Sequence, residues 1–174
     1  MDIQSVCGII HKIADGFEGN ALRCLERHSG NVVVAIQEQL ICGQDGDGKP
    51  LSPTYDDDPY FDEEGPWQGR SDEYKAWKRS ITPPRGSKLL DLPPRPDNVP
   101  NLYITGKFHG EITASLDKDE LLIDPGKGDG PDIVSKYCKY GHDILGMGPS
   151  SVTYFNREYM MPAIEKFFKD CGYR

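Results

Sequence analysis

Prolines are concentrated in the middle of this chain. Ten of the fourteen prolines lie between residues 50 and 100. Proline has no backbone N–H and its ring fixes φ, so it interrupts helices and is excluded from central strands. We therefore expect extended chain and turns here, with regular structure on either side. The predicted organisation is one domain over 1–174, with N-terminal helices (1–42), a loop excursion (43–100), and a hairpin with a C-terminal helix (101–174).

The N-terminal part carries apolar residues at helical spacing. They recur every three or four residues and begin with Ile3, Val6, Ile10, Ile13 and Phe17. Such a stripe forms one face of a helix. The glycines near residue 16 suggest a break, so helices are expected over about 2–15 and 18–41. The stripe packs either in the subunit core or between subunits. Two matched stripes in one chain can cover each other, which favours the core.

Regular patterning returns after the prolines. Thr105-Gly106 predicts a turn or short helix that leads into a hairpin, because apolar residues alternate on both sides of a turn at Lys118-Asp119. A final helix is predicted over 159–171, with Pro162 in its first turn, where the missing N–H costs nothing. These elements predict an α+β fold, in which amphipathic helices pack on a small antiparallel β-sheet and a long proline-rich acidic and basic loop excursion joins them.

Charge is segregated within the excursion. Residues 45–64 hold eight acids against Lys49 alone, a sum of −7, whereas residues 75–95 sum to +5. The two stretches can pair inside one subunit, or each can face the opposite patch on a neighbouring subunit. The candidate subunit-interface residues are the charged and aromatic residues of both stretches: Asp56, Asp57, Asp58, Tyr60, Phe61, Asp62, Glu63, Glu64, Lys75, Lys78, Arg79, Arg85 and Lys88.

Aromatic residues interleave with the acids, and a short helix is predicted just beyond them. Tyr55, Tyr60, Phe61 and Trp67 lie among the acids, which is unlike the composition of a disordered tail. The helix at 71–80 has its own aromatic face. This pattern predicts a loop that docks on its own domain or on a neighbouring subunit.

Two patterns raise the question of a metal site. Asp45-Gly-Asp47-Gly48 resembles the start of an EF-hand loop, but Lys49 and Pro50 stand at its fifth and sixth positions, and the sixth should be glycine. Three Cys-x-x-x-His pairs occur: Cys7/His11, Cys24/His28 and Cys138/His142. No Cys-x-x-Cys motif reinforces them. We predict no metal and no cofactor, with a hard cation at Asp56-Asp57-Asp58 as the open alternative.

Composition argues against several classes of function. The net charge of −8 and pI of about 5.0 disfavour nonspecific binding to DNA or to an anionic membrane. No specific nucleic-acid site is predicted. No apolar run approaches the ~20 residues that span a bilayer, and residues 1–5 show no start of a signal peptide. The five cysteines are odd in number and widely spaced, which fits reduced thiols in a cytosol.

An ordered set of short motifs spans residues 71–170. In chain order they are Tyr74-x-x-Trp77-Lys78, Leu102-x-x-Thr105-Gly106-Lys107-Phe108-x-x-Glu111-Ile112, Tyr137-Cys138-Lys139-Tyr140-Gly141, and Phe155 followed by Met161-Pro162-Ala163-Ile164. Together with the N-terminal helix, they resemble the bacteriophage virion-morphogenesis family of tail-completion and head–tail connector (neck ring) proteins. The scaffold positions of the resemblance are Trp77, Thr105, Gly106, Phe108 and Pro162.

The resemblance implies a noncatalytic subunit of a phage particle. Such a subunit forms a homo-oligomeric ring at the neck or completes the tail, has other phage connector or tail proteins as partners, and involves no membrane. It resides in the virion after assembly in the cytoplasm of the bacterial host. The chain departs from the family pattern at Glu111, where the family often has Ser, and in the acidic insertion at 43–70, whose role the resemblance does not supply.

Two other classes of function compete with a structural role. An enzyme would need an acid–base pair, and His109 with Glu111 is the nearest candidate; however, positions i and i+2 share a face only in a fully extended chain. An acidic adaptor or inhibitor could use the acidic loop to mimic DNA, although the basic stretch beside it argues against a pure mimic. We therefore predict a structural protein without enzymatic activity.

Overall fold

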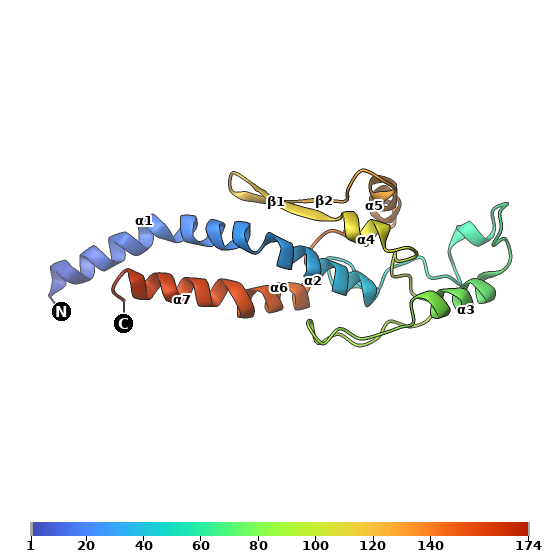
Figure 1. The fold of residues 1–174 in the computed structure, drawn as a ribbon, viewed down its shortest axis with the longest axis horizontal. Helices are drawn as coiled ribbons and strands as arrows, with labels where there is room; N and C mark the ends of the chain where they lie inside the picture. Colours follow the sequence, from blue (N-terminus) through green and yellow to red (C-terminus); the bar gives the residue numbers. More distant parts are fainter. Residues whose placement is uncertain (1, 174) are drawn as a thin grey trace.

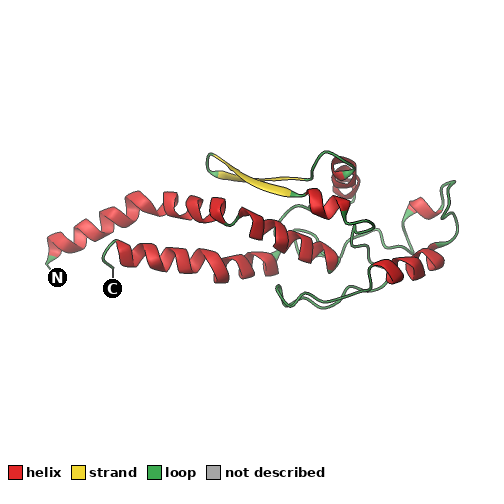
Figure 2. Cartoon of the chain, viewed as in Figure 1, coloured by secondary structure: helices red, strands yellow, loops and turns green. Residues whose placement is uncertain are grey.

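A computed structural model describes residues 2–173 as an elongated, mostly helical molecule. Figure 1 shows the long helix α1 (Ile3–Arg27) beside the antiparallel α7 (Met161–Asp170), with both ends of the chain at the same end of the molecule. The described sheet is a single pair of antiparallel strands (Figure 2). The predicted α+β class is therefore confirmed.

The remaining elements follow one another between α1 and α7. They are α2 (Ser29–Ile41), a 3-10 turn (Pro59–Phe61), α3 (Ser71–Ile81), α4 (Lys107–Glu111), β1 (Thr113–Asp117), β2 (Glu120–Asp124), α5 (Gly130–Lys139), α6 (Pro149–Phe155) and a π-helical turn (Asn156–Met160).

The first helix does not break near Gly16. α1 runs through Gly16 and Gly19, and the helical path is interrupted only at His28, before α2 begins. A Cβ added at Gly16 would lie 2.9 Å from the ring of Phe167 in α7. The prediction of helices over 2–15 and 18–41 is therefore wrong: this glycine allows two helices to approach closely, and a glycine inside a helix costs only about 1 kcal/mol.

The C-terminal helix begins earlier than predicted. α6 passes through the π-helical turn directly into α7, and the Met161 N–H donates to the Asn156 carbonyl, five residues back. Pro162 lies in the first turn of the segment α7, but the helix already runs through the preceding residues, so the prediction that the final helix starts at this proline is wrong. A proline removes one backbone hydrogen bond and crowds the preceding turn. The wider π-helical turn accommodates that loss, so the helix continues past Pro162 instead of starting there.

The hairpin is formed as predicted. β1 and β2 pair in antiparallel register, with Thr113 opposite Asp124 and Asp117 opposite Glu120, around the turn at Lys118-Asp119. Side chains alternate between exposed and half-buried along both strands. On the half-buried side, Leu121 and Ile123 pack against the main core. The hairpin lies along α1 and α2 (Figure 1).

The main core lies between α2, the hairpin, α5 and α6. Its buried members are Val32, Ile36, Leu40, Leu51, Val99, Phe108, Ile112, Tyr137, Ile144 and Phe155. Leu51 and Val99 belong to the excursion, so both of its ends are anchored in this core.

The excursion also folds back further along its length. Ser87 and Leu92 form an isolated β-bridge, and Leu90 is buried against Ala35 of α2 and Tyr154 of α6. The proline segments are extended chain and turns as predicted, but they are packed rather than loose.

Candidate functional site

A cleft of about 390 Å³ lies between the excursion, α3, residues 100–108 and α5. We call it the aromatic cleft, because aromatic rings from all four segments line it. They are Tyr55, Tyr60, Phe61, Trp67, Tyr74, Trp77, Tyr103, Phe108 and Tyr137. A cleft of this size and composition is typical of sites that bind apolar groups.

Tyr74 of α3 is the centre of the aromatic cluster. Its ring centroid lies 5.1 Å from Tyr55, 5.3 Å from Phe61 and 5.2 Å from Trp67, all in edge-on geometry. Such aromatic pairs contribute about 0.5–1.5 kcal/mol each beyond burial of area. The acidic loop therefore docks on its own domain, which was one of the two predicted alternatives. Phe61 is buried in this cluster and is not available as a subunit-interface residue.

Lys78 is buried beneath the cleft, with 1% of its surface exposed. Its Nζ donates to Asn101 Oδ1 at 2.9 Å and to the carbonyl of Tyr103. Burial lowers the pKa of Lys78 to about 8, and the positive charge of Arg95 adds to the effect. The prediction that Lys78 contacts a neighbouring subunit is therefore wrong, because the side chain ties α3 to the segment at 101–103. Periodicity placed it on α3 correctly but could not reveal the acceptors above it.

Several other predicted interface residues form ion pairs inside the subunit. Among the described residues, five such pairs involve them: Lys75 with Asp56 and with Asp72, Arg79 with Asp97, Arg85 with Glu38 at 2.7 Å, and Lys136 with Asp58 at 3.0 Å. Asp57 accepts a hydrogen bond from Thr54 at 2.7 Å. Within residues 2–173, only the Lys75–Asp56 ion pair joins the acidic stretch directly to the basic one.

The remaining members are exposed. Asp62, Glu63, Glu64 and Lys88 form no ion pair within residues 2–173, and Tyr60 is 42% exposed at the cleft. Much of the charge that was predicted to face neighbouring subunits is thus compensated within one copy.

The scaffold residues of the resemblance gather around the same cleft. Trp77, Thr105, Gly106 and Phe108 all line it, whereas Pro162 lies at the start of α7. Gly106 caps α4 with φ +83°, and a Cβ there would lie 2.8 Å from the Tyr103 hydroxyl. The left-handed backbone and this close approach both require glycine.

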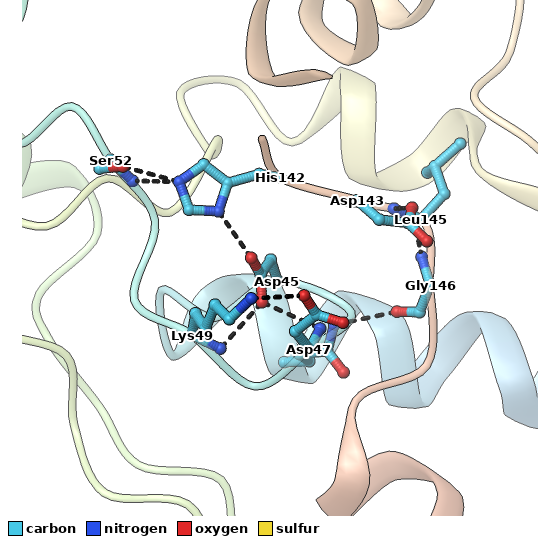
Figure 3. Close-up of polar contacts among 9 residues, drawn as sticks. Asp45, Asp47, Lys49, Ser52, His142, Asp143, Leu145 and Gly146 are labelled. Carbon is cyan, nitrogen blue, oxygen red and sulfur yellow. Dashed lines mark hydrogen bonds and ion pairs between the residues drawn. The ribbon is translucent and has the colours of Figure 1, made fainter. Parts of the chain in front are cut away.

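A polar network, shown in Figure 3, joins the start of the excursion to residues 142–146. His142 Nδ1 lies 2.6 Å from Asp45 Oδ2, and His142 Nε2 lies 2.7 Å from Ser52 Oγ. Asp45 is fully buried and also accepts from the N–H groups of Asp47 and Lys49. Burial would raise the pKa of Asp45, but the hydrogen bonds, first of all that from His142, outweigh it and hold the pKa below its usual range.

Ser52, His142 and Asp45 are linked in the same way as the residues of a Ser–His–Asp triad, but the backbone N–H of the serine has a different partner. The Ser52 N–H also donates to His142 Nε2, at 3.1 Å, so this nitrogen is an acceptor and Nδ1 donates to Asp45. In serine proteases, the N–H of the nucleophile instead faces the oxyanion. We therefore name these residues the Asp45–His142 clamp, because they fasten two chain segments together.

The clamp also explains the EF-hand-like pattern. The carboxylate of Asp45 faces His142, and Asp47 pairs with Lys49 at 2.7 Å. Within residues 2–173, no three His, Cys, Asp or Glu side chains are grouped to hold a metal ion. Sequence reasoning missed the clamp because its partners lie 97 and 90 residues apart. The only signals were Asp45-Gly-Asp47 and the Cys138/His142 pair, which pointed toward metals.

His109 and Glu111, the acid–base pair considered for catalysis, have different hydrogen-bond partners. His109 is buried, and its Nε2 lies 3.0 Å from the Asn101 carbonyl. Burial lowers the pKa of the His109 imidazole. Glu111 instead accepts from the Gly128 N–H at 3.2 Å. The two side chains thus bind different backbone segments, at Asn101 and at Gly128.

A second surface lies far from the cleft, on what we call the two-helix arm: residues 3–20 of α1 together with α7. The two helices meet through Gly16 and Phe167, and through Phe17 and Phe168, whose ring centroids lie 6.2 Å apart. Within α1, all of which the structure describes, Cys24 is the one buried residue.

Large apolar side chains of the arm are exposed to solvent. Ile3 is 80% exposed and Ile10 is 58% exposed. The prediction that the N-terminal stripe packs in the core therefore holds for α2 but not for the first half of α1.

Within residues 2–173, none of the helices combines the length and apolar character needed to cross a bilayer. No protein-family model, no curated protein and no solved structure matches this chain.

Proposed function

We propose that this chain is a noncatalytic structural subunit of a bacteriophage particle. In this proposal, copies assemble into a homo-oligomeric ring at the head–tail connector or neck, or complete the tail, and contact other connector or tail proteins in the virion. The ordered motifs from Tyr74 to Ile164 support this choice of protein class. The exposed side chains of Ile3 and Ile10 on the two-helix arm support the assembly.

The arm is the observation that carries the proposal. Ile3 and Ile10 are exposed to water on a helix that also packs against α7. Burial of apolar surface contributes about 25 cal/mol per Å². Exposed apolar side chains that cluster on one element mark a surface at which another protein can bind.

The test is the mass of the purified chain over a range of concentrations, by light scattering and by electron microscopy of any rings. Ile10→Glu is expected to lower the mass to that of a monomer, because it places a carboxylate in the contact. Gln4→Glu introduces the same group at an exposed polar position of the same arm and is expected to leave assembly intact. A chain that is monomeric at every concentration, or an assembly that tolerates Ile10→Glu, contradicts the proposal.

An acidic adaptor or inhibitor is the second candidate. It is favoured by Asp62, Glu63 and Glu64, which are exposed and form no ion pair among the described residues. Such a protein would remain monomeric alone and would bind a host or phage protein through these three acidic residues. Replacing the three acids with their amides would then abolish that binding, whereas a ring driven by the apolar arm would be unaffected.

A further inference from the structure

The chain exposes more surface than a compact monomer of its mass. Its accessible surface is 10459 Å² at a mass of 19.5 kDa. A compact folded monomer of that mass exposes about 8,500 Å², so the surplus is about 1,900 Å². A protein–protein interface of standard size covers about 800 Å² on each partner. The surplus therefore matches two such faces on every copy.

Exposed apolar side chains mark a face at each end of the molecule. One end carries Ile3 and Ile10 on the two-helix arm. At the other end, Ile104 is 53% exposed and Tyr60 is 42% exposed, and both line the aromatic cleft. Figure 1 places the arm and α3, which forms one wall of the cleft, at opposite ends of the long axis.

The cleft suits aliphatic side chains better than a charged ligand. Its walls are mainly aromatic and aliphatic. Lys78 is buried and already donates to two acceptors, and Lys136 is paired with Asp58. Lys107 and Asp129, which also line the cleft, carry opposite charges. A partner that inserts isoleucine side chains would gain apolar burial and would leave these charges in place.

We propose that the arm of one copy docks in the aromatic cleft of the next, with Ile3 and Ile10 as anchors and Ile104 as part of the receiving wall. This inference rests on the proposed function and names the contact that joins the subunits. Since arm and cleft lie at opposite ends of one copy, they meet only between copies. Such a contact joins two different surfaces and repeats head to tail, which closes into a ring when the rotation permits.

A symmetric arm-to-arm dimer is the competing arrangement. It would use one face of each copy and leave the cleft open. The surplus surface of two faces per copy favours the head-to-tail contact, in which every subunit contributes both an arm and a cleft.

Two complementary variants test the contact. Ile3→Glu with Ile10→Glu disables the arm and keeps the cleft, whereas Ile104→Glu disables the cleft and keeps the arm. Each variant alone is expected to be monomeric where the unchanged chain assembles. Mixed in equal amounts, they are expected to form a heterodimer and to stop there, because each pair retains one working arm and one working cleft. Sedimentation velocity distinguishes these species.

Matched controls separate the contact from general effects of a new charge. Gln4→Glu on the arm and Ile81→Glu on α3 introduce the same group outside the proposed contact; Ile81 is 38% exposed and does not line the cleft. Both controls are expected to assemble normally. Circular dichroism and thermal melting of all variants establish that they remain folded.

Tryptophan emission gives a readout that needs no variant. The chain has two tryptophans, Trp67 and Trp77, and both line the cleft. When an arm enters the cleft, water is displaced from the indole rings, so emission is expected to shift to shorter wavelength as the concentration rises through the assembly range. The arm variant alone is expected to show no shift.

The outcomes separate this inference from the proposed function. If the chain assembles without a shift in tryptophan emission, if Ile104→Glu assembles normally, or if the mixed variants stay monomeric, the arm does not dock in the cleft, although the subunit still assembles. If the unchanged chain stays monomeric throughout, both the contact and the proposed function are wrong.

Discussion

The part of the molecule outside the arm, which we call the body, and the two-helix arm are held together in different ways. In the body, buried apolar residues are joined by buried polar contacts between distant segments, such as Asp45 with His142 and Lys78 with Asn101. In the arm, two helices meet along one line, and the outer side of α1 remains exposed. The geometry of the body is thus fixed within one copy, whereas the arm keeps apolar surface that another molecule can cover.

The largest expected difference between the two regions is in the cost of removing an apolar side chain. Ile36 in α2 is fully buried, whereas Phe17 in the arm is 40% exposed. Ile36→Ala is expected to lower the free energy of unfolding by about 2–5 kcal/mol, because it leaves a cavity. Phe17→Ala is expected to cost less, since much of its surface is already in water. Urea denaturation of the monomer measures both, and equal costs would contradict the division into body and arm.

A polar substitution in the body should have an intermediate effect. Asp45→Asn keeps the side-chain shape but removes the charge that faces His142 and replaces one acceptor oxygen with a donor. We expect a loss of about 1–3 kcal/mol in the free energy of unfolding at neutral pH. Asp47→Asn is the matched control in the same loop; its side chain is 63% exposed, and the expected change is within about 0.5 kcal/mol.

The effect of Asp45→Asn should also depend on pH. The pKa of Asp45 is held below its usual range in the folded chain, so the unfolded chain binds this proton more readily. The carboxylate therefore stabilises the fold at neutral pH, and this contribution is lost as the pH falls below about 4. The unfolding free energies of the two proteins should converge on acidification. A difference that stays constant down to pH 3 would mean that the charge of Asp45 does not stabilise the clamp.

The smallest expected effect compares two glycines of the arm. A Cβ at Gly8 meets no atom within 4 Å, whereas a Cβ at Gly16 approaches Phe167 to 2.9 Å. Gly8→Ala is expected to stabilise α1 by up to about 1 kcal/mol through helix propensity. Gly16→Ala gains the same propensity but displaces the Phe167 ring, so its net gain should be smaller. Thermal melting of both variants checks this, and identical gains would show that α1 and α7 are less closely packed.

Local patterns predicted the local elements. Alternation gave the hairpin and its turn, and helical spacing gave α3 and the stripe of α1 and α2. The break in α1 was misplaced because a glycine can end a helix or admit a neighbouring one, and only the partner, Phe167, decides which. The continuation of the C-terminal helix back to Pro149 was missed because the π-helical turn has no simple sequence signature.

The candidate site was predictable in its composition but not in its geometry. The aromatic residues of the acidic loop indicated docking, and Tyr74 turned out to be the residue on which they dock. Charge sums could not show which cations already had partners: Arg79 pairs with Asp97, and Arg85 pairs with Glu38. These pairs depend on the tertiary path of the excursion, which a sum over neighbouring residues does not contain.

The π-helical turn at Asn156–Met160 determines which side of α7 faces α1. Successive residues of an α-helix are rotated by about 100° around its axis. Removing one residue from this turn would therefore swing everything beyond it by roughly a quarter of a revolution. Phe167 would then no longer face Gly16, and a different edge of α7 would lie along α1. One extra residue far from the tip thus decides which surface the arm presents to its surroundings.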